Sequence, residues 1–227
     1  MIHESALYLA RRFTAVFICA LFLFSIATFA GPPLICHVLE IGNAKSLPWI
    51  SRDWNLTGAE SYDTNNLASD TLAILNSDPT VVVHMETLRR ATLYVRKDPN
   101  AAKQLLTKLL ARAETTSESA QAALANFDAG YLAEGYKQWI GKDEPNPAQG
   151  LDGYALVRKA IRMRGDDAQM EFAAALITLQ GPRSDHEYHA QRAIAGAKND
   201  ALLAQNLSLR FHGVQGQTMA ELISQGK

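Results

Sequence analysis

The helical periodicity of residues 78–97, DPTVVVHMETLRRATLYVRK, constrains the fold of this chain most strongly. Buried-type side chains recur there at alternating steps of four and three, a spacing that aligns them along one face of a helix. Asp78 can cap the first free backbone N–H groups, and Pro79 suits the first helical position. The pattern predicts an amphipathic helix with an inward stripe of Val81, Met85, Leu88, Thr92 and Val95.

The opposite face of this helix carries charge. Glu86 precedes Arg89 and Arg90 by three and four residues. We expect these side chains on the outer face, in local ion pairs that contribute about 0.3 kcal/mol each. The β-branched run Val81–Val83 also suits a strand, but the helical pattern continues well past it.

Residues 62–227 show the same helical periodicity in one segment after another, which predicts a series of helices. Asp98-Pro99 opens a second helix in the same way as Asp78-Pro79. The clearest loop is 141–150, GKDEPNPAQG, where a sub-boundary of the helical domain could fall. The expected caps and helix ends are a Thr115/Glu118 capping box, the caps Asp166, Ser184 and Asn199, and the terminators Gly165 and Gly181.

The predicted helices group into pairs that start near residues 62, 99, 150 and 184. Two of the three steps lie close to the period of about 34 residues in tetratricopeptide-type repeats. The sequence therefore predicts an all-α fold, a tetratricopeptide-like array of helix pairs (an α-solenoid), with an irregular helical bundle as the alternative. Such arrays bind peptides or proteins on a concave surface, so the inner helices are the expected contact elements.

Residues 1–30 carry the pattern of a signal peptide. Arg11 and Arg12 precede a continuous apolar run that ends in small residues at Ala30, which predicts cleavage after Ala30 and an exported protein, periplasmic or extracellular. The alternative is an uncleaved anchor in the inner membrane, because residues 13–30 approach the length needed to span a bilayer.

Residues 31–61 form an irregular entry segment, since prolines and glycines interrupt any long helix there. Leu34 to Ile41 could form a short strand or an extended strip packed on the helices. Trp49 and Trp54 are expected to anchor the segment by burying a large apolar area.

Two blocks of sequence resemble a family of uncharacterised exported bacterial proteins. The first is GPPLICHVLEIGNAKSLPW, residues 31–49, and the second is METLRRATLYV, residues 85–95. The resemblance covers about residues 31–97. It implies bacterial export, and it implies no activity, cofactor or site residue.

Charge and motif content narrow the function. The chain has a formal net charge of -1 and no basic run, so it gives no electrostatic reason to expect a nucleic-acid partner. It contains no GxGxxG, P-loop, GxSxG or CxxC motif. These observations favour a binding protein without a cofactor over an enzyme, although catalytic residues can be dispersed in a sequence.

One group of neighbouring residues suggests a metal-binding site. His186 and His189 lie three apart, on one face of a predicted helix, and Asp185 is adjacent. The spacing differs from HExxH, in which the histidines lie four apart. A Ser184/Glu187 capping box explains the glutamate without metal chemistry.

Other candidate residues favour structural roles. Cys36 and His37 are neighbours in an extended segment, so their side chains point to opposite sides and form no dyad. Cys36 is expected to be a small buried hydrophobe. His84 and Glu86, two apart on a helix, do not face each other. His212 is expected at a helix end. The aromatic set Phe127, Tyr131, Tyr136 and Trp139 has the helical spacing of a core.

The sequence therefore predicts an exported module of the bacterial cell envelope that binds a protein or peptide partner. One alternative is a metal-binding protein or metal-dependent hydrolase that uses His186 and His189. The other is a membrane-anchored structural protein that contacts the membrane only through an uncleaved N-terminal segment.

Overall fold

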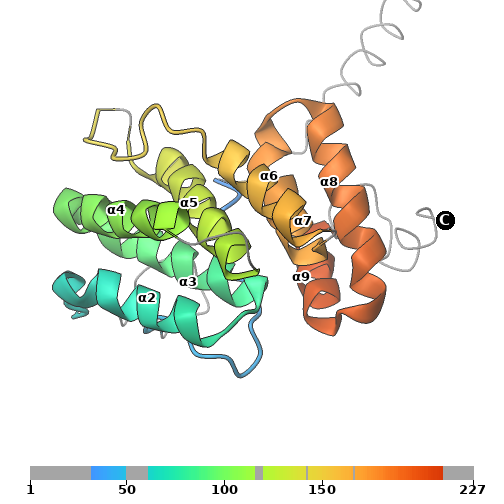
Figure 1. The fold of residues 1–227 in the computed structure, drawn as a ribbon, viewed down its shortest axis with the longest axis horizontal. Coiled ribbons are helices and arrows are strands. Elements are labelled where there is room, and N and C mark those ends of the chain that lie inside the picture. The colour runs from blue at the N-terminus through green and yellow to red at the C-terminus, as the bar shows by residue number, and fades with distance from the viewer. Residues whose placement is uncertain (1–31, 50–60, 116–119, 142, 166, 212–227) are drawn as a thin grey trace, which may run out of the picture. The chain divides into compact units, whose positions relative to one another are not determined.

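The computed structural model describes residues 32–49, 61–115, 120–141, 143–165 and 167–211. These residues form eight α-helices and no strand, as the helical periodicity predicts (Figure 1). The helices are α2 (Leu67–Ser77), α3 (Val81–Tyr94), α4 (Pro99–Thr115), α5 (Ala120–Trp139), α6 (Gly153–Arg164), α7 (Ala168–Ile177), α8 (Arg183–Gly196) and α9 (Ala201–Phe211). Short 3-10 turns lie at Thr64–Asn66, Val95–Lys97, Thr178–Gln180 and Ala197–Asn199.

Helix α3 confirms the helix predicted from its periodicity but corrects its start. The stripe from Val81 to Val95 is buried. The helix begins at Val81, and its N-cap is Thr80. The Asp78 carboxylate accepts a hydrogen bond from the Thr80 N–H at 2.8 Å, so Asp78 and Pro79 belong to the turn that precedes the helix.

Aspartates provide the caps at several helix starts, because a carboxylate can accept the N–H groups left free in the first turn. Asp98 caps α4 as predicted, through the Ala101 N–H. Three predicted caps are wrong. Thr115 is the last residue of α4, where its hydroxyl donates to the Ala111 carbonyl. Ser184 lies inside α8, and Asn199 precedes Asp200, the residue that caps α9. The other capping aspartates are Asp152 for α6, Asp167 for α7 and Asp200 for α9.

The helices form two layers. Helices α3, α5 and α7 pack against one another as an inner layer and are buried on nearly every side. Helices α2, α4, α6 and α8 pack on this layer from outside, with α2 against α3 and α4, α4 against α5, α6 against α5 and α7, and α8 against α7 (Figure 1). The alanine-rich sequences of α5 and α7 allow this close packing, since small side chains let backbones approach.

The crossing of α5 and α6 is tightest at two glycines. A Cβ atom on Gly130 would lie 2.5 Å from the Gly153 carbonyl oxygen, and a Cβ on Gly153 would lie equally close to the Gly130 carbonyl oxygen. These two glycines therefore let the backbones of α5 and α6 approach each other closely. The loop 141–150 connects two helices that pack directly on each other.

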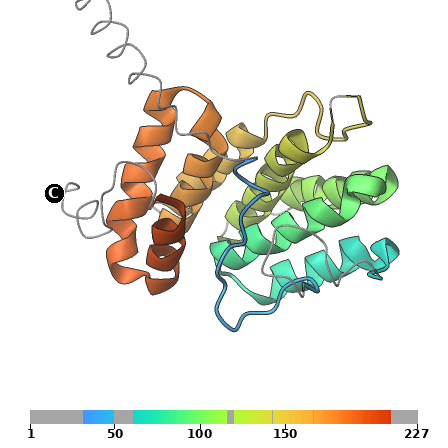
Figure 2. The same ribbon diagram turned by 180° about the vertical axis from the view of Figure 1, so that it is seen from behind.

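The other side of the inner layer is covered by the entry segment, residues 32–49, and by α9. The segment crosses α3 as an irregular strip, drawn in blue in Figure 2. The predicted short strand does not form: residues 33–37 make a turn, with the Ile35 and Cys36 N–H groups bonded to the Pro32 carbonyl, and residues 38–41 form an irregular strip. Leu34, Ile35, Leu39 and Leu47 each have at most 2 % of their surface exposed, so the segment is part of the hydrophobic core.

Some predictions concern residues outside the described part of the chain. These are the signal peptide or anchor at 1–30, and Trp54, Glu118, Asp166 and His212. None of the described helices is both long enough and apolar enough to cross a membrane.

Candidate functional site

The entry segment is held on α3 by side chains that bind its main chain. A strip without strand neighbours leaves its N–H and C=O groups needing partners, and α3 supplies them. The hydrogen bonds run from the Leu39 N–H to Glu86 Oε2 (3.0 Å), from Arg89 Nη1 to the Ile35 carbonyl (3.1 Å), and from Arg90 Nη1 to the Leu47 carbonyl (2.6 Å).

Glu86 is the centre of this arrangement, and its position corrects the predicted outer face of α3. Its carboxylate accepts from Arg89 at 2.7 and 2.9 Å and from Arg90 at 2.7 Å. The side chains of Glu86 and Arg89 have no exposed surface. The Trp49 ring lies 4.8 Å from the Arg89 guanidinium carbon, a cation–π contact. This face of α3 therefore lies under the entry segment instead of facing solvent.

A second set of hydrogen bonds links the entry segment to α9. The Glu40 N–H donates to Asn206 Oδ1, and Asn206 Nδ2 donates back to the Glu40 carbonyl, both at 2.9 Å. One amide side chain thus satisfies both main-chain groups of one residue, as a neighbouring strand would. Asn206 is 1 % exposed.

A buried charge cluster joins α3, α4 and α5. His84 Nδ1 lies 2.6 Å from Asp128 Oδ1, and Arg112 Nη1 donates to Asp128 Oδ2 at 2.7 Å. His84 and Asp128 are fully buried. As predicted, His84 does not face Glu86. Arg112 also lines a pocket of about 290 Å³, together with Asp78 and Gln121.

A pocket of about 350 Å³ opens between α6, α7 and α8. Ligand sites commonly begin at about 300 Å³. Glu171 of α7 lies at its base, 1 % exposed. Tyr154 of α6 and His189 of α8 line it from either side, and Arg158, Arg162, Asp185 and Tyr188 complete the polar and aromatic lining.

The polar groups at the base of this pocket are connected in a chain. His189 Nδ1 lies 2.5 Å from Glu171 Oε2, and His189 Nε2 lies 2.7 Å from the Tyr154 hydroxyl. Because a carboxylate only accepts, Nδ1 donates to Glu171, and Nε2 shares a hydrogen bond with the Tyr154 hydroxyl. Arg192 Nε donates to the other Glu171 oxygen at 2.6 Å. The chain fixes the orientation of Tyr154 and His189.

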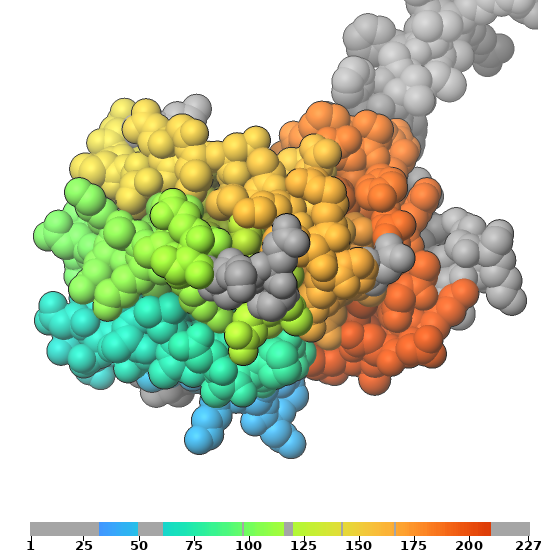
Figure 3. Space-filling view, in the orientation of Figure 1, coloured from blue at the N-terminus to red at the C-terminus, as the bar shows by residue number. Residues whose placement is uncertain are grey.

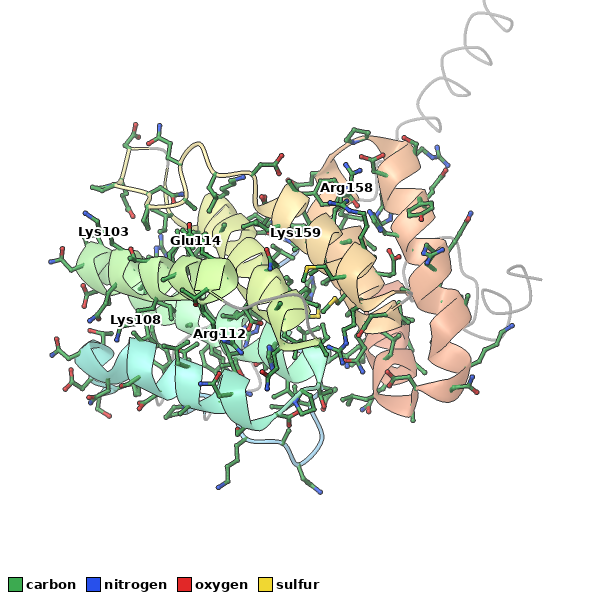
Figure 4. All side chains as sticks on the ribbon, viewed as in Figure 1. Lys103, Lys108, Arg112, Glu114, Arg158 and Lys159 are labelled. Atoms are coloured by element: carbon green, nitrogen blue, oxygen red, sulfur yellow. The ribbon has the colours of Figure 1, made fainter. Side chains whose placement is uncertain are left out.

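The rim of the pocket is aromatic and basic. Tyr188 is 56 % exposed, and the Arg192 guanidinium carbon lies 5.5 Å from its ring centre. The Arg158 guanidinium carbon lies 5.6 Å from the ring centre of Tyr154. Figure 4 labels Arg158 beside α6, toward α8. Burial and the nearby Asp185 carboxylate raise the pKa of Tyr154, so its phenol is neutral at physiological pH.

The two histidines predicted as metal ligands form hydrogen bonds within the protein. His186 Nδ1 lies 2.8 Å from the Ala175 carbonyl oxygen. Both ring nitrogens of His189 are engaged with Glu171 and Tyr154, so a metal ion at His189 would have to displace one of them. In the described part of the chain, no three His, Cys, Asp or Glu side chains gather closely enough to hold a metal ion.

The remaining candidates lie apart from this pocket. Cys36 was predicted to be buried, but it is only half-buried, and its neighbour His37 is exposed; both lie in the entry segment. Phe127, Tyr131 and Tyr136 are buried in the core as predicted. Trp139 is half-buried and packs against the core.

Sequence reasoning missed the partners of the two best-connected histidines. Asp128 lies 44 residues after His84, and Glu171 lies 18 residues before His189. Each partner sits on a buried helix face among apolar residues. An acid in an otherwise apolar stretch is the one signal that could have marked it, because a buried carboxylate needs a partner.

A larger groove, of about 610 Å³, runs between α4 and the loop at 145–149. Its walls include Leu106, Leu110, Pro145 and Pro147, and no ion pair or buried titratable group lies among its described residues. The pocket between α6, α7 and α8 therefore carries the richer chemistry.

Comparison with protein-family models, with curated proteins and with solved structures gave no match to this chain.

Proposed function

We propose that this protein is an exported module of the bacterial cell envelope that binds a protein or peptide partner through the surface formed by α6 and α8. The observation that carries the proposal is the combination of an exposed aromatic, Tyr188, with Tyr154 and Arg158 around one pocket. Tyrosine and arginine are enriched among the residues that dominate binding energy at protein interfaces.

The order of the helices supports a tetratricopeptide-like array. Pairs α2/α3, α4/α5 and α6/α7 each place their second helix in the inner layer. In such arrays a partner commonly binds the inner helices. Here the entry segment and α9 cover those helices, so the predicted contact elements are buried.

The surface of α6 and α8 is the alternative that remains open. Figure 3 shows these helices, in yellow-orange and orange, adjoining on the face turned to the viewer. The exposed aromatic beside this pocket supports the proposal, because aromatic residues and arginine are enriched at protein interfaces. Tyr188 and Leu209 are the large apolar or aromatic residues that stand out as exposed among the described residues.

Export rests on the sequence of residues 1–30 and on the resemblance to exported bacterial proteins. N-terminal sequencing of protein isolated from the envelope fraction tests it. A mature chain that starts at Gly31 supports the signal peptide. A chain in the membrane that retains residues 1–30 supports the anchored alternative.

Photo-crosslinking in the native bacterium tests the contact surface. A photoreactive amino acid replaces Tyr188 in one strain, and replaces Lys108, an exposed residue of α4, in a matched control strain. Figure 4 places Lys108 on α4, away from α6. We expect a reproducible envelope protein crosslinked at position 188 and absent at position 108. Equal crosslinking at both positions, or none at position 188, would refute this surface.

A further inference from the structure

We infer, building on the proposed function, that the pocket between α6, α7 and α8 receives the carboxylate of an acidic side chain in an extended peptide, and that Arg158 and Arg162 bind it. The acid at the base of the pocket already has partners. Glu171 is already bound by Arg192 and His189. His189 in turn is bound to the Tyr154 hydroxyl, so these four groups satisfy one another.

Two cationic side chains of the pocket lining do not take part in this network. Arg158 and Arg162 are exposed and form no ion pair with any described acid. They lie four residues apart on α6, and Tyr154 lies four residues before Arg158, so all three side chains share one face of the helix. The pair therefore presents two adjacent guanidinium groups at the mouth of the pocket.

The geometry of guanidinium groups favours a planar acceptor. Each presents parallel N–H groups that match the two oxygens of a carboxylate. The Tyr154 ring lies under the Arg158 guanidinium, which limits its freedom and lowers the entropy lost on binding. The connected base beneath it holds Tyr154 in place.

Asp185 lines the same pocket, and Glu171, already paired with Arg192, lies at its base. Asp185 opposes a second negative charge on a bound anion, so it repels a carboxylate monoanion less than a phosphate dianion. The volume of about 350 Å³ admits a side chain or two, and the exposed Tyr188 ring offers an apolar wall for the methylenes of a glutamate.

Fluorescence anisotropy with the full chain tests this inference. The probes are two fluorescein-labelled dodecapeptides that are identical except for Glu or Gln at three positions. We expect the Glu peptide to bind about tenfold more tightly than the Gln peptide. The double variant R158Q/R162Q should remove this preference, whereas the matched variant K103Q/K108Q on α4, with the same loss of charge, should retain it.

Several outcomes would overturn the inference: equal binding of the two peptides, no binding of either, or loss of the preference in K103Q/K108Q as well. A competition arm separates anion classes. Acetate should displace the Glu peptide at least as well as inorganic phosphate at equal concentration, and stronger displacement by phosphate would contradict a carboxylate site. A partner crosslinked at position 188 whose capture is unchanged in R158Q/R162Q would refute this inference and leave the proposed function standing.

Discussion

The His84 imidazole is hydrogen-bonded through both ring nitrogens to groups that can only accept: Nδ1 to Asp128 Oδ1 and Nε2 to the Asp78 carbonyl oxygen, each at 2.6 Å. Two acceptors require two N–H donors, so His84 is an imidazolium. Burial alone would lower the pKa of His84, but the charge of Asp128 and its hydrogen bond outweigh burial and raise the pKa above its ordinary value.

This pair predicts a stability that depends on pH. A folded pKa above the unfolded value of about 6.5 gives a stabilisation that is complete below that pH. It is lost as the pH rises through the raised pKa of His84. Chemical denaturation of the wild-type chain and of H84Q, which cannot titrate at this position, measures the difference in unfolding free energy. We expect that difference to shrink as the pH rises, and a difference that grows or stays constant would contradict the assignment.

Replacing Glu86 with glutamine should strongly destabilise the protein. The E86Q change leaves the buried Arg89 guanidinium without its counter-charge, and breaking a buried pair costs about 3 kcal/mol or more. The same substitution at Glu187, whose pair with Arg183 is exposed, is the matched control and should leave the denaturation midpoint unchanged. Similar midpoints for the two variants would show that Glu86 does not hold the entry segment.

Removing the Asn206 amide should release the entry segment from α9. N206A leaves the Glu40 N–H and C=O without their partner, at a cost of about 1–3 kcal/mol. Hydrogen exchange followed by mass spectrometry should show faster exchange in peptides that cover residues 39–41. The exposed Asn76 provides the control variant N76A, which should exchange as the wild type does. Unchanged exchange in N206A would argue that apolar contacts alone hold the segment.

At Gly130, helix propensity and tertiary packing predict opposite effects of an alanine substitution on stability. Helix propensity alone predicts that G130A stabilises an interior helical position by about 1 kcal/mol. Because the added Cβ would lie 2.5 Å from the Gly153 carbonyl oxygen, we expect instead a loss of about 2 kcal/mol. Thermal unfolding measures the sign. In G141A the new Cβ meets nothing closer than 3.6 Å, and this control should melt near the wild type.

Local patterns predicted the helices well. The stripe on α3 and the start of α4 at Pro99 depend on neighbours within a few residues, so the sequence carries their signal. The prediction that Glu86 and Arg89 face solvent was wrong, because the segment that covers them lies 43 to 54 positions earlier in the chain. A polar side chain on a helix looks solvent-exposed in sequence whenever its partner comes from elsewhere in the chain.

In the candidate pocket, too, the sequence did not indicate which side chains contact each other. His189 was singled out from its spacing to His186, yet its partners are Glu171 and Tyr154, on two other helices. Only the packing of α6, α7 and α8 brings these groups together. Periodicity indicates which face of a helix is buried, but it does not say against which other helix that face packs.

The bond between Glu40 and Asn206 has a consequence for the order of events during synthesis. The two residues are 166 positions apart, so the contact cannot form until Asn206 has been synthesised. Contacts of such long range slow folding, because the chain entropy of closing the loop is lost first. At roughly 5–20 residues per second, the ribosome delays this closure by many seconds after the entry segment appears. A chain that must cross a membrane unfolded would gain from that delay, since the entry segment of a nascent chain reaches its place only when the last described helix arrives.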